Sequence, residues 1–251
     1  MIENPKQHSS MDIWEKVWDE NTINGQLLNL QKDEYFEHVT NLAKNIPKKG
    51  RILEAGCGLG RWIFYLNELG FYTIGIDTAK TAIKRAHKYA KKKRKNIDLV
   101  VADVEHLPFR DHAFDLILSL GVIEHFVKGN RDHIIKESYR CLNQKGMLFL
   151  TTPNKFLIAH TLLRFYSKLR REWKVGLEHS FTTKDLTRFL KAQNFRITRQ
   201  TIFGFKFAST KRISFLPFLW PFVKIPSIRS YVYDVLTHLC RGLKLIGFYA
   251  V

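Results

Sequence analysis

Apolar residues in the middle of the chain form short runs that alternate with longer stretches of helical periodicity. The runs predict five strands, over residues 51–55, 71–76, 97–102, 113–120 and 146–151. Helical spacing is expected in three of the intervals between them, from the glycine-rich stretch to residue 69, over 80–94 and over 132–142. Strands joined through helices are typical of crossover units and a parallel sheet. The pattern therefore predicts a doubly wound α/β domain.

The two flanks of this core carry looser patterns. Residues 12–46 space tryptophans and aliphatic residues as helices do, so two helices are expected before the core. After residue 154, helices are expected over 156–171, from Thr182 onward and over 231–245, and strands over 195–207 and 246–251. We therefore expect a seven-stranded, mostly parallel sheet. The chain is expected to consist of an N-terminal helical cap (1–49), a core (50–154) and a C-terminal half of the same domain (155–251).

Positive charge is concentrated in two parts of the chain. The formal net charge is +18; residues 80–95 hold nine lysines and arginines and no acid, and residues 155–251 hold eighteen against four acids. Such asymmetry favours an anionic partner: a phosphorylated substrate, a membrane surface or nucleic acid. A charge excess that only keeps the protein in solution is the alternative interpretation.

Several classes of protein are excluded by what the sequence lacks. No apolar run approaches the roughly 20 residues that cross a bilayer, and the polar start has no apolar signal-peptide core. The three cysteines are far apart and form no CxxC pair, so neither a disulfide framework nor a zinc site is expected. A cytoplasmic protein without a metal centre is predicted.

A glycine-rich loop follows the first predicted strand, where residues 54–60 read EAGCGLG. A dinucleotide-binding loop requires GxGxxG, but its third glycine falls on Arg61 in one frame and on Ile63 in the other. The acid inside the strand, Glu54, would repel a pyrophosphate, whereas it suits a ligand that carries an ammonium and a sulfonium group. The loop therefore disfavours a nicotinamide cofactor.

From here the chain resembles the class I S-adenosylmethionine (SAM)-dependent methyltransferases over about residues 50–200. Besides the loop, the matching segments are GID at 75–77, ADVEHLPF at 102–109, AFDLI at 113–117, SLGVIEHF at 119–126, LNQKGML at 142–148, TPN at 152–154 and HSFT at 179–182. Gln144 and Lys145 replace the more usual Pro-Gly pair, a change that should only reshape a turn. Within the superfamily, the chain looks most like the ubiquinone/menaquinone-biosynthesis type of small-molecule enzyme.

The resemblance implies a Rossmann-like fold that binds SAM and releases S-adenosylhomocysteine (SAH). The cofactor-binding residues that it implies are Glu54, Gly56, Cys57, Gly58, Gly60, Asp77, Thr78, Asp103, Val104 and Leu120. Asp77 would accept hydrogen bonds from both ribose hydroxyls, and Asp103 from the adenine amino group unless it caps a helix. Glu54 would anchor the methionine end, and the carbonyl of Leu120 would face its ammonium group.

Two histidines are candidates for the base that removes a proton from the methyl acceptor. His125 follows the fourth predicted strand on the cofactor side and has an unperturbed pKa near 6.5; a structural capping role is the alternative. His179 is the second candidate, because its loop should fold over the site. The other histidines of this region have no metal-ligand spacing.

Taken with the resemblance, these features predict methyl transfer to an oxygen or carbon of a small-molecule or lipid-linked acceptor, which the charge suggests is anionic. A fatty-acyl cyclopropane-type enzyme and a non-catalytic SAM-binding module are the alternatives. Residues 209–229 interleave aromatics and prolines between cations, so this insertion is expected to cover the substrate or to contact the inner membrane face. Nucleic-acid binding is not expected, since no base-reading module is recognisable.

Overall fold

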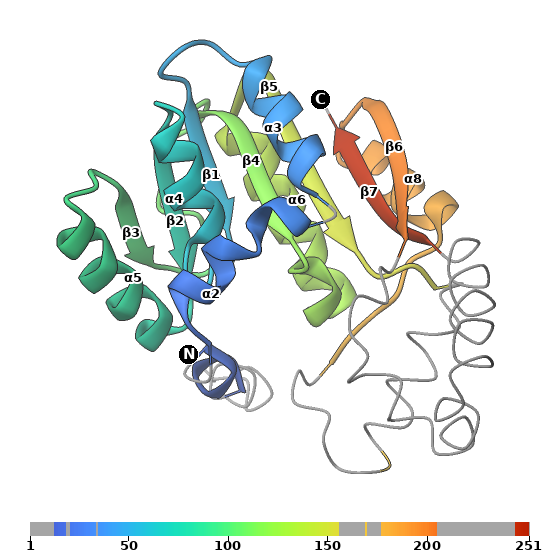
Figure 1. The fold of residues 1–251 in the computed structure, drawn as a ribbon. Coiled ribbons are helices and arrows are strands. Elements are labelled where there is room, and N and C mark those ends of the chain that lie inside the picture. Colours follow the sequence, from blue (N-terminus) through green and yellow to red (C-terminus); the bar gives the residue numbers. More distant parts are fainter. Residues whose placement is uncertain are drawn as a thin grey trace, which may run out of the picture.

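The strands of the computed structural model form one twisted sheet in the order β3-β2-β1-β4-β5-β7-β6 (Figure 1). The structure describes residues 13–18, 21–33, 35–155, 169, 177–204 and 244–250. Its strands are β1 (Arg51–Ala55), β2 (Tyr72–Asp77), β3 (Asp98–Val101), β4 (Phe114–Leu120), β5 (Leu142–Thr152), β6 (Ile197–Gly204) and β7 (Lys244–Ala250). Strands β1 to β5 pair in parallel, and β7 is antiparallel to both β5 and β6. The predicted seven-stranded, mostly parallel sheet is confirmed.

Helices cover both faces of the sheet, because neighbouring residues of each buried strand point to opposite sides. The helical elements are a helix over residues 13–18, α2 (Ile23–Leu28), η1 (Leu30–Lys32), α3 (Phe36–Lys44), α4 (Arg61–Glu68), α5 (Lys80–Lys93), η2 (Ile123–His125), α6 (Lys128–Cys141) and α8 (Thr183–Ala192). In β1, Leu53 joins the core cluster that contains α6 and α8, and its neighbour Ile52 joins the one that contains α3.

The order of the strands fixes where a ligand site can form. The chain runs outward from β1 through β2 to β3 and then crosses back to β4 on the other side of β1. A crevice opens at such a reversal, outside the carboxyl ends of the two central strands. The segments that follow β1 and β4 therefore meet at one edge of the sheet.

Several predicted boundaries were wrong. Residues 244–245 are strand, not the end of a helix, and the segment before β1 holds more helical pieces than the two expected. Strand β5 starts at Leu142, four residues early, because a register shift lets it pair with Phe114 before the regular ladder begins. The predictions for residues 205–207, 209–229 and 231–243, and for 156–171 except the helical Leu169, lie outside the described residues.

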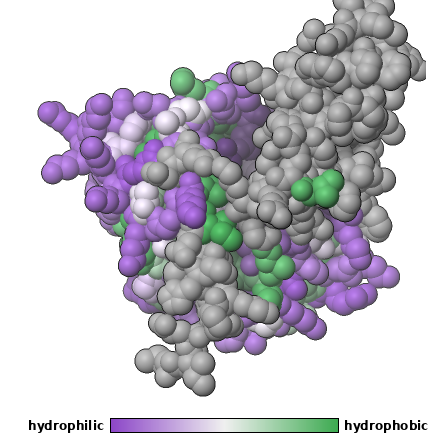
Figure 2. Space-filling view, turned by 90° about the horizontal axis from the view of Figure 1, so that it is seen from below, coloured by the Kyte–Doolittle hydropathy of each residue, from purple (hydrophilic) through white to green (hydrophobic). Residues whose placement is uncertain are grey.

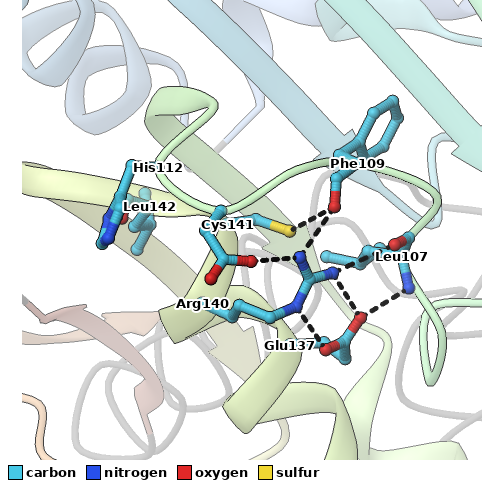
Figure 3. Close-up of polar contacts among 8 residues, drawn as sticks. Leu107, Phe109, His112, Glu137, Arg140, Cys141 and Leu142 are labelled. Atoms are coloured by element: carbon cyan, nitrogen blue, oxygen red, sulfur yellow. Dashed lines mark hydrogen bonds and ion pairs between the residues drawn. The ribbon is translucent and has the colours of Figure 1, made fainter.

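Arg140, near the end of α6, fastens this helix to the loop that follows β3 (Figure 3). Its guanidinium donates to both carboxylate oxygens of Glu137 at 2.7 and 2.8 Å and to Asp111 at 2.7 Å. It also donates to the carbonyls of Phe109 and Leu107, at 2.7 and 3.1 Å. The five hydrogen bonds use every N–H of the guanidinium, as expected of an arginine whose role is structural.

Replacing Arg140 should therefore destabilise the protein. Arg140→Gln is expected to lower the free energy of unfolding by about 1–3 kcal/mol, because the partners lose charge-assisted hydrogen bonds. Urea denaturation measures this change. Arg188→Gln is the control, since its exposed guanidinium only approaches Asp185 at 3.9 Å and its loss should change little. Equal midpoints for the wild type and Arg140→Gln would refute the structural role.

Candidate functional site

The glycine-rich loop after β1 is bonded to the end of β2. The amides of Gly56 and Cys57 both donate to the carbonyl of Ile76, at 2.9 and 2.8 Å. The amide of Gly58 donates to the Asp77 carboxylate at 2.7 Å. Gly56, Gly58 and Gly60 have φ values of 80°, 53° and 76°, a region that L side chains rarely adopt. The structure thus places the predicted loop glycines, Cys57 and Asp77 together.

Asp77, the last residue of β2, holds the glycine-rich loop in place through its carboxylate. Its second carboxylate oxygen accepts from the Ala79 amide at 2.9 Å. Burial raises the pKa of Asp77 above its ordinary value, although its hydrogen bonds to backbone amides act in the opposite direction. Thr78, next in the chain, is half-buried. The contact of Asp77 with a ribose stays a prediction.

Glu54 is a buried carboxylate within β1. Its side chain is 4% exposed, and its Oε2 has no hydrogen-bond partner among the described residues. Burial raises its pKa to about 8. An unpartnered buried carboxylate is unfavourable and would be stabilised by a cation. Glu54 therefore fits a ligand whose ammonium group enters this edge of the sheet.

The helix over residues 13–18 packs onto the glycine-rich loop, a contact that the sequence did not predict. A Cβ built on Gly58 would lie 2.4 Å from the Trp18 ring, so only glycine fits beneath this indole. Arg85 of α5 holds the helix end by donating to the carbonyl of Trp18 at 2.5 Å, and Glu15 accepts from the Thr81 amide at 3.0 Å. In the sequence, the four-residue spacing of Trp14 and Trp18 was the signal that both rings share one helix face.

Trp14, on the same helix, connects the loop to the first histidine candidate. Its ring lies 6.2 Å from that of Trp18 and meets the His125 ring edge-on at 4.9 Å. Nδ1 of His125 lies 2.7 Å from the carbonyl oxygen of Leu177, which fixes the neutral ring in the tautomer that donates there. Burial lowers the pKa of His125. The ring is therefore largely neutral at pH 7, with Nε2 able to accept a proton.

Glu124 precedes His125 and is a second buried acid. It is 4% exposed, its Oε2 has no partner among the described residues, and burial raises its pKa to about 8. Its carbonyl accepts from the His179 amide at 2.7 Å. The two predicted histidines are thus brought to the same region, although the side chain of His179 is exposed.

The predicted adenine-side residues have structural partners of their own. Asp103 accepts from the amide of Glu105 at 2.9 Å, which is a turn-capping contact. Val104 is 4% exposed and packs in the first core cluster, whereas Leu120, predicted at the ammonium end of the cofactor, is half-buried against the second. Their contacts with a cofactor stay predictions.

Two further features bear on where chemistry can occur. Within the described part of the chain, no group of three or more metal-ligating side chains is found. A surface hollow lined by Arg51, Tyr72 and neighbouring residues lies at the amino ends of β1 and β2, away from the histidines. In the space-filling view of the face at the carboxyl ends of the parallel strands, hydrophobic residues are exposed among hydrophilic ones (Figure 2).

Comparisons with known proteins agree with this architecture. Residues 53–150 match the family model described as a methyltransferase domain. The chain is 36% identical over 132 residues to a ubiquinone biosynthesis O-methyltransferase of Pelagibacter ubique, which covers 53% of this chain and 52% of that protein. It is also 34% identical over 100 residues to a probable tRNA methyltransferase 9B of Homo sapiens, over 39% of this chain and 20% of that protein.

A solved structure extends the likeness beyond the matched domain. A SAM-dependent methyltransferase of Mesorhizobium loti superposes with a TM-score of 0.60 at 17% identity, over 88% of this chain and 99% of the other. The first curated relatives are matched over about half of their length, between 52% and 56%. Together with the ordered motifs and the strand order, these matches show that the chain belongs to the class I SAM-dependent methyltransferase superfamily.

Proposed function

We propose that this protein transfers the methyl group of SAM to an oxygen or carbon of a small-molecule or lipid-linked acceptor. The observation that carries the proposal is the buried Glu54 carboxyl beside the glycine-rich loop, whose Oε2 has no hydrogen-bond partner among the described residues. A site of this kind favours a cationic ligand, and SAM carries an ammonium and a sulfonium group. An oxygen acceptor is favoured by the likeness to an O-methyltransferase.

The residues that would hold the cofactor are those of the loop and of the ends of β1 and β2. Glu54 would pair with the ammonium group, and Asp77 would bind the ribose hydroxyls. When bound, SAM supplies an activated methyl group, so that the chain has to position the acceptor and to take up its proton. SAH would remain in the same contacts.

His125 is the residue that we assign to the proton. Its Nδ1 is engaged by Leu177 and its pKa is lowered, so Nε2 is a base at neutral pH. A positioned base of this kind contributes roughly 10²–10⁴-fold to a rate. His179 is the second candidate, and its pKa is also lowered, by burial and by the charges of Arg131 and Lys155.

Two other activities use the same cofactor site. A fatty-acyl cyclopropane-type enzyme would alkylate a lipid double bond, and a non-catalytic module would bind SAM without turnover. Formation of SAH with a small-molecule cell extract separates an enzyme from a module. The tRNA methyltransferase likeness makes RNA a further extract fraction to assay.

Membrane contact is proposed from the sequence alone. Within the described residues, no helix is long and apolar enough to cross a membrane. Residues 209–229, which are outside that part, combine Phe218 and Trp220 with flanking Lys211, Arg212 and Lys224. Aromatic side chains beside cations suit the interface of an anionic leaflet, where each cation contributes about 1 kcal/mol.

Cofactor binding should release a proton from Glu54. With a pKa of about 8 this carboxyl is mostly protonated at pH 7, and a bound ammonium group favours the ionised form. Affinity for SAH should therefore rise between pH 6 and pH 8. Calorimetry at pH 7 should give different enthalpies in phosphate and Tris buffers, and NAD should not bind.

The matched variants are Glu54→Gln and Glu124→Gln, which alter two acids of equal burial and similar pKa. Glu54→Gln should abolish proton release and weaken SAH binding by about 10-fold or more. Glu124→Gln should leave both unchanged. The reverse result would make Glu124 the partner of the ammonium group, and buffer-independent enthalpies in the wild type would contradict ionisation on binding.

Loss of His125 should affect turnover far more than cofactor binding. His125→Ala is expected to slow SAH formation by about 10²-fold while SAH affinity is nearly unchanged. In the wild type, the rate should fall as pH drops through the lowered pKa of His125, since protonated imidazole is no base. His133→Ala, an exposed histidine on α6, is the control. A parallel loss of affinity would indicate a structural role instead.

Replacing Phe218 and Trp220 with serine should weaken association with anionic liposomes, because their burial in the interface is lost. Flotation with phosphatidylglycerol vesicles measures this, and SAH affinity is the control for folding. Unchanged flotation, or equal binding of the wild type to neutral vesicles at low salt, would rule out the interfacial role.

A further inference from the structure

The two arginines that α6 carries have opposite surroundings. Arg140 uses all of its N–H groups within the protein (Figure 3). Arg131, in the first turns of the same helix, is 9% exposed, and its Nη1 is buried without a hydrogen-bond partner among the described residues. Burying a charged donor without an acceptor is unfavourable. Arg131 is therefore poorly explained as a structural residue.

The contacts of Arg131 place it on an aromatic platform at the edge of the proposed active site. Its Cζ lies 5.0 Å from the centre of the Phe181 ring. The His179 ring meets the same ring edge-on at 4.9 Å, and the Lys155 amide donates to the Phe181 carbonyl at 2.8 Å. The Phe181 ring thus contacts the side chains of Arg131 and His179, and its backbone binds that of Lys155.

Two acids lie near this cluster: the charge of Asp132 acts on Arg131, and Asp185 interacts with Lys155 and His179. Asp185 accepts from the Thr182 hydroxyl at 2.6 Å, and Asp132 accepts from Gln193 at 3.4 Å. Although His179 is exposed, partial desolvation lowers its pKa, and the positive charges of Arg131 and Lys155 lower it further, against a smaller opposing effect of Asp185. At the His179 ring, the positive charges of Arg131 and Lys155 therefore outweigh the negative charge of Asp185.

The same segment connects the cluster to the proposed base. The His179 amide donates to the carbonyl of Glu124, and the Leu177 carbonyl is bonded to His125. A group held by Arg131 would thus lie in the region where the acceptor must approach His125.

We propose that Arg131, with Lys155 and His179, binds an anionic group of the methyl acceptor, either a carboxylate or a phosphate. The guanidinium offers an already oriented, desolvated donor, and ionised acceptors give the strongest hydrogen bonds to it. Because the acceptor is taken to be methylated at the neighbouring site, the inference rests on the proposed function. According to this inference, the protein selects its acceptor by the negative charge that Arg131 binds close to His125.

The test measures the pKa of His179 by NMR in isotope-labelled protein that is saturated with SAH. The measurement is repeated in the presence of benzoate, of phenyl phosphate and of benzamide. An anion bound at the cluster should raise this pKa by about 1, because an opposite charge favours the protonated ring. The groups that act on His179 are Arg131, Lys155 and Asp185. Benzoate identifies a carboxylate site and phenyl phosphate a phosphate site; neutral benzamide should have no effect.

Variants identify the residue responsible. Arg131→Gln should abolish the response to both anions, Arg131→Lys should keep part of it, and Arg140→Gln should keep all of it. No response of the wild type to either anion, or an equal response to benzamide, overturns the inference even if Arg131→Gln fails to fold. If SAH alone raises the pKa and blocks benzoate, the anion is the cofactor's own carboxylate and the acceptor assignment is wrong. Absence of SAH binding by calorimetry would instead refute the proposed function, while the anion titration without SAH still tests the cluster.

Discussion

The hydrogen bond from the Gly58 amide to the Asp77 carboxylate is the contact on which the rest of the site depends. It joins the loop after β1 to the end of β2, and the two amides bonded to Ile76 reinforce the junction. The positive φ angles at the glycines make this path possible, since other residues would be strained there. Once the loop is fixed, α4 can start directly after it, at Arg61.

Burial at this edge also sets the charge state of the site. Two acids, Glu54 and Glu124, lie within the protein near the ends of β1 and β4, and desolvation raises the pKa of each to about 8. His125 responds to burial in the opposite direction, because its charged form is the protonated one. At neutral pH the site therefore holds protonated acids beside a neutral base, so a cationic ligand would favour ionisation of the acid with which it pairs.

The basic character of the chain has more than one structural meaning. The alanines and Ile83 of α5 face the core, while its lysines lie on the exposed side. These lysines therefore form a solvated helix surface. Arg140 uses all of its N–H groups in hydrogen bonds, whereas Nη1 of Arg131 has no hydrogen-bond partner among the described residues. Net charge alone cannot separate these cases, because each cation is defined by the acceptors within its reach.

The sequence by itself determined the parallel core, the glycine-rich loop and the superfamily. Strand periodicity and the spacing of motifs are local properties of the chain, and they suffice to predict the five parallel strands β1 to β5 and the loop between Glu54 and Arg61. The boundaries that failed, at β5 and β7, depend on pairing with distant strands, which local patterns do not encode. Only the tertiary structure decided that Trp18 covers Gly58, that Trp14 meets His125, and that Arg131 reaches Phe181. It also decided that Nη1 of Arg131 is buried without an acceptor in the part of the chain that the structure describes. These contacts join segments that are far apart in the chain, and burial and unpaired donors exist only once such segments have packed together.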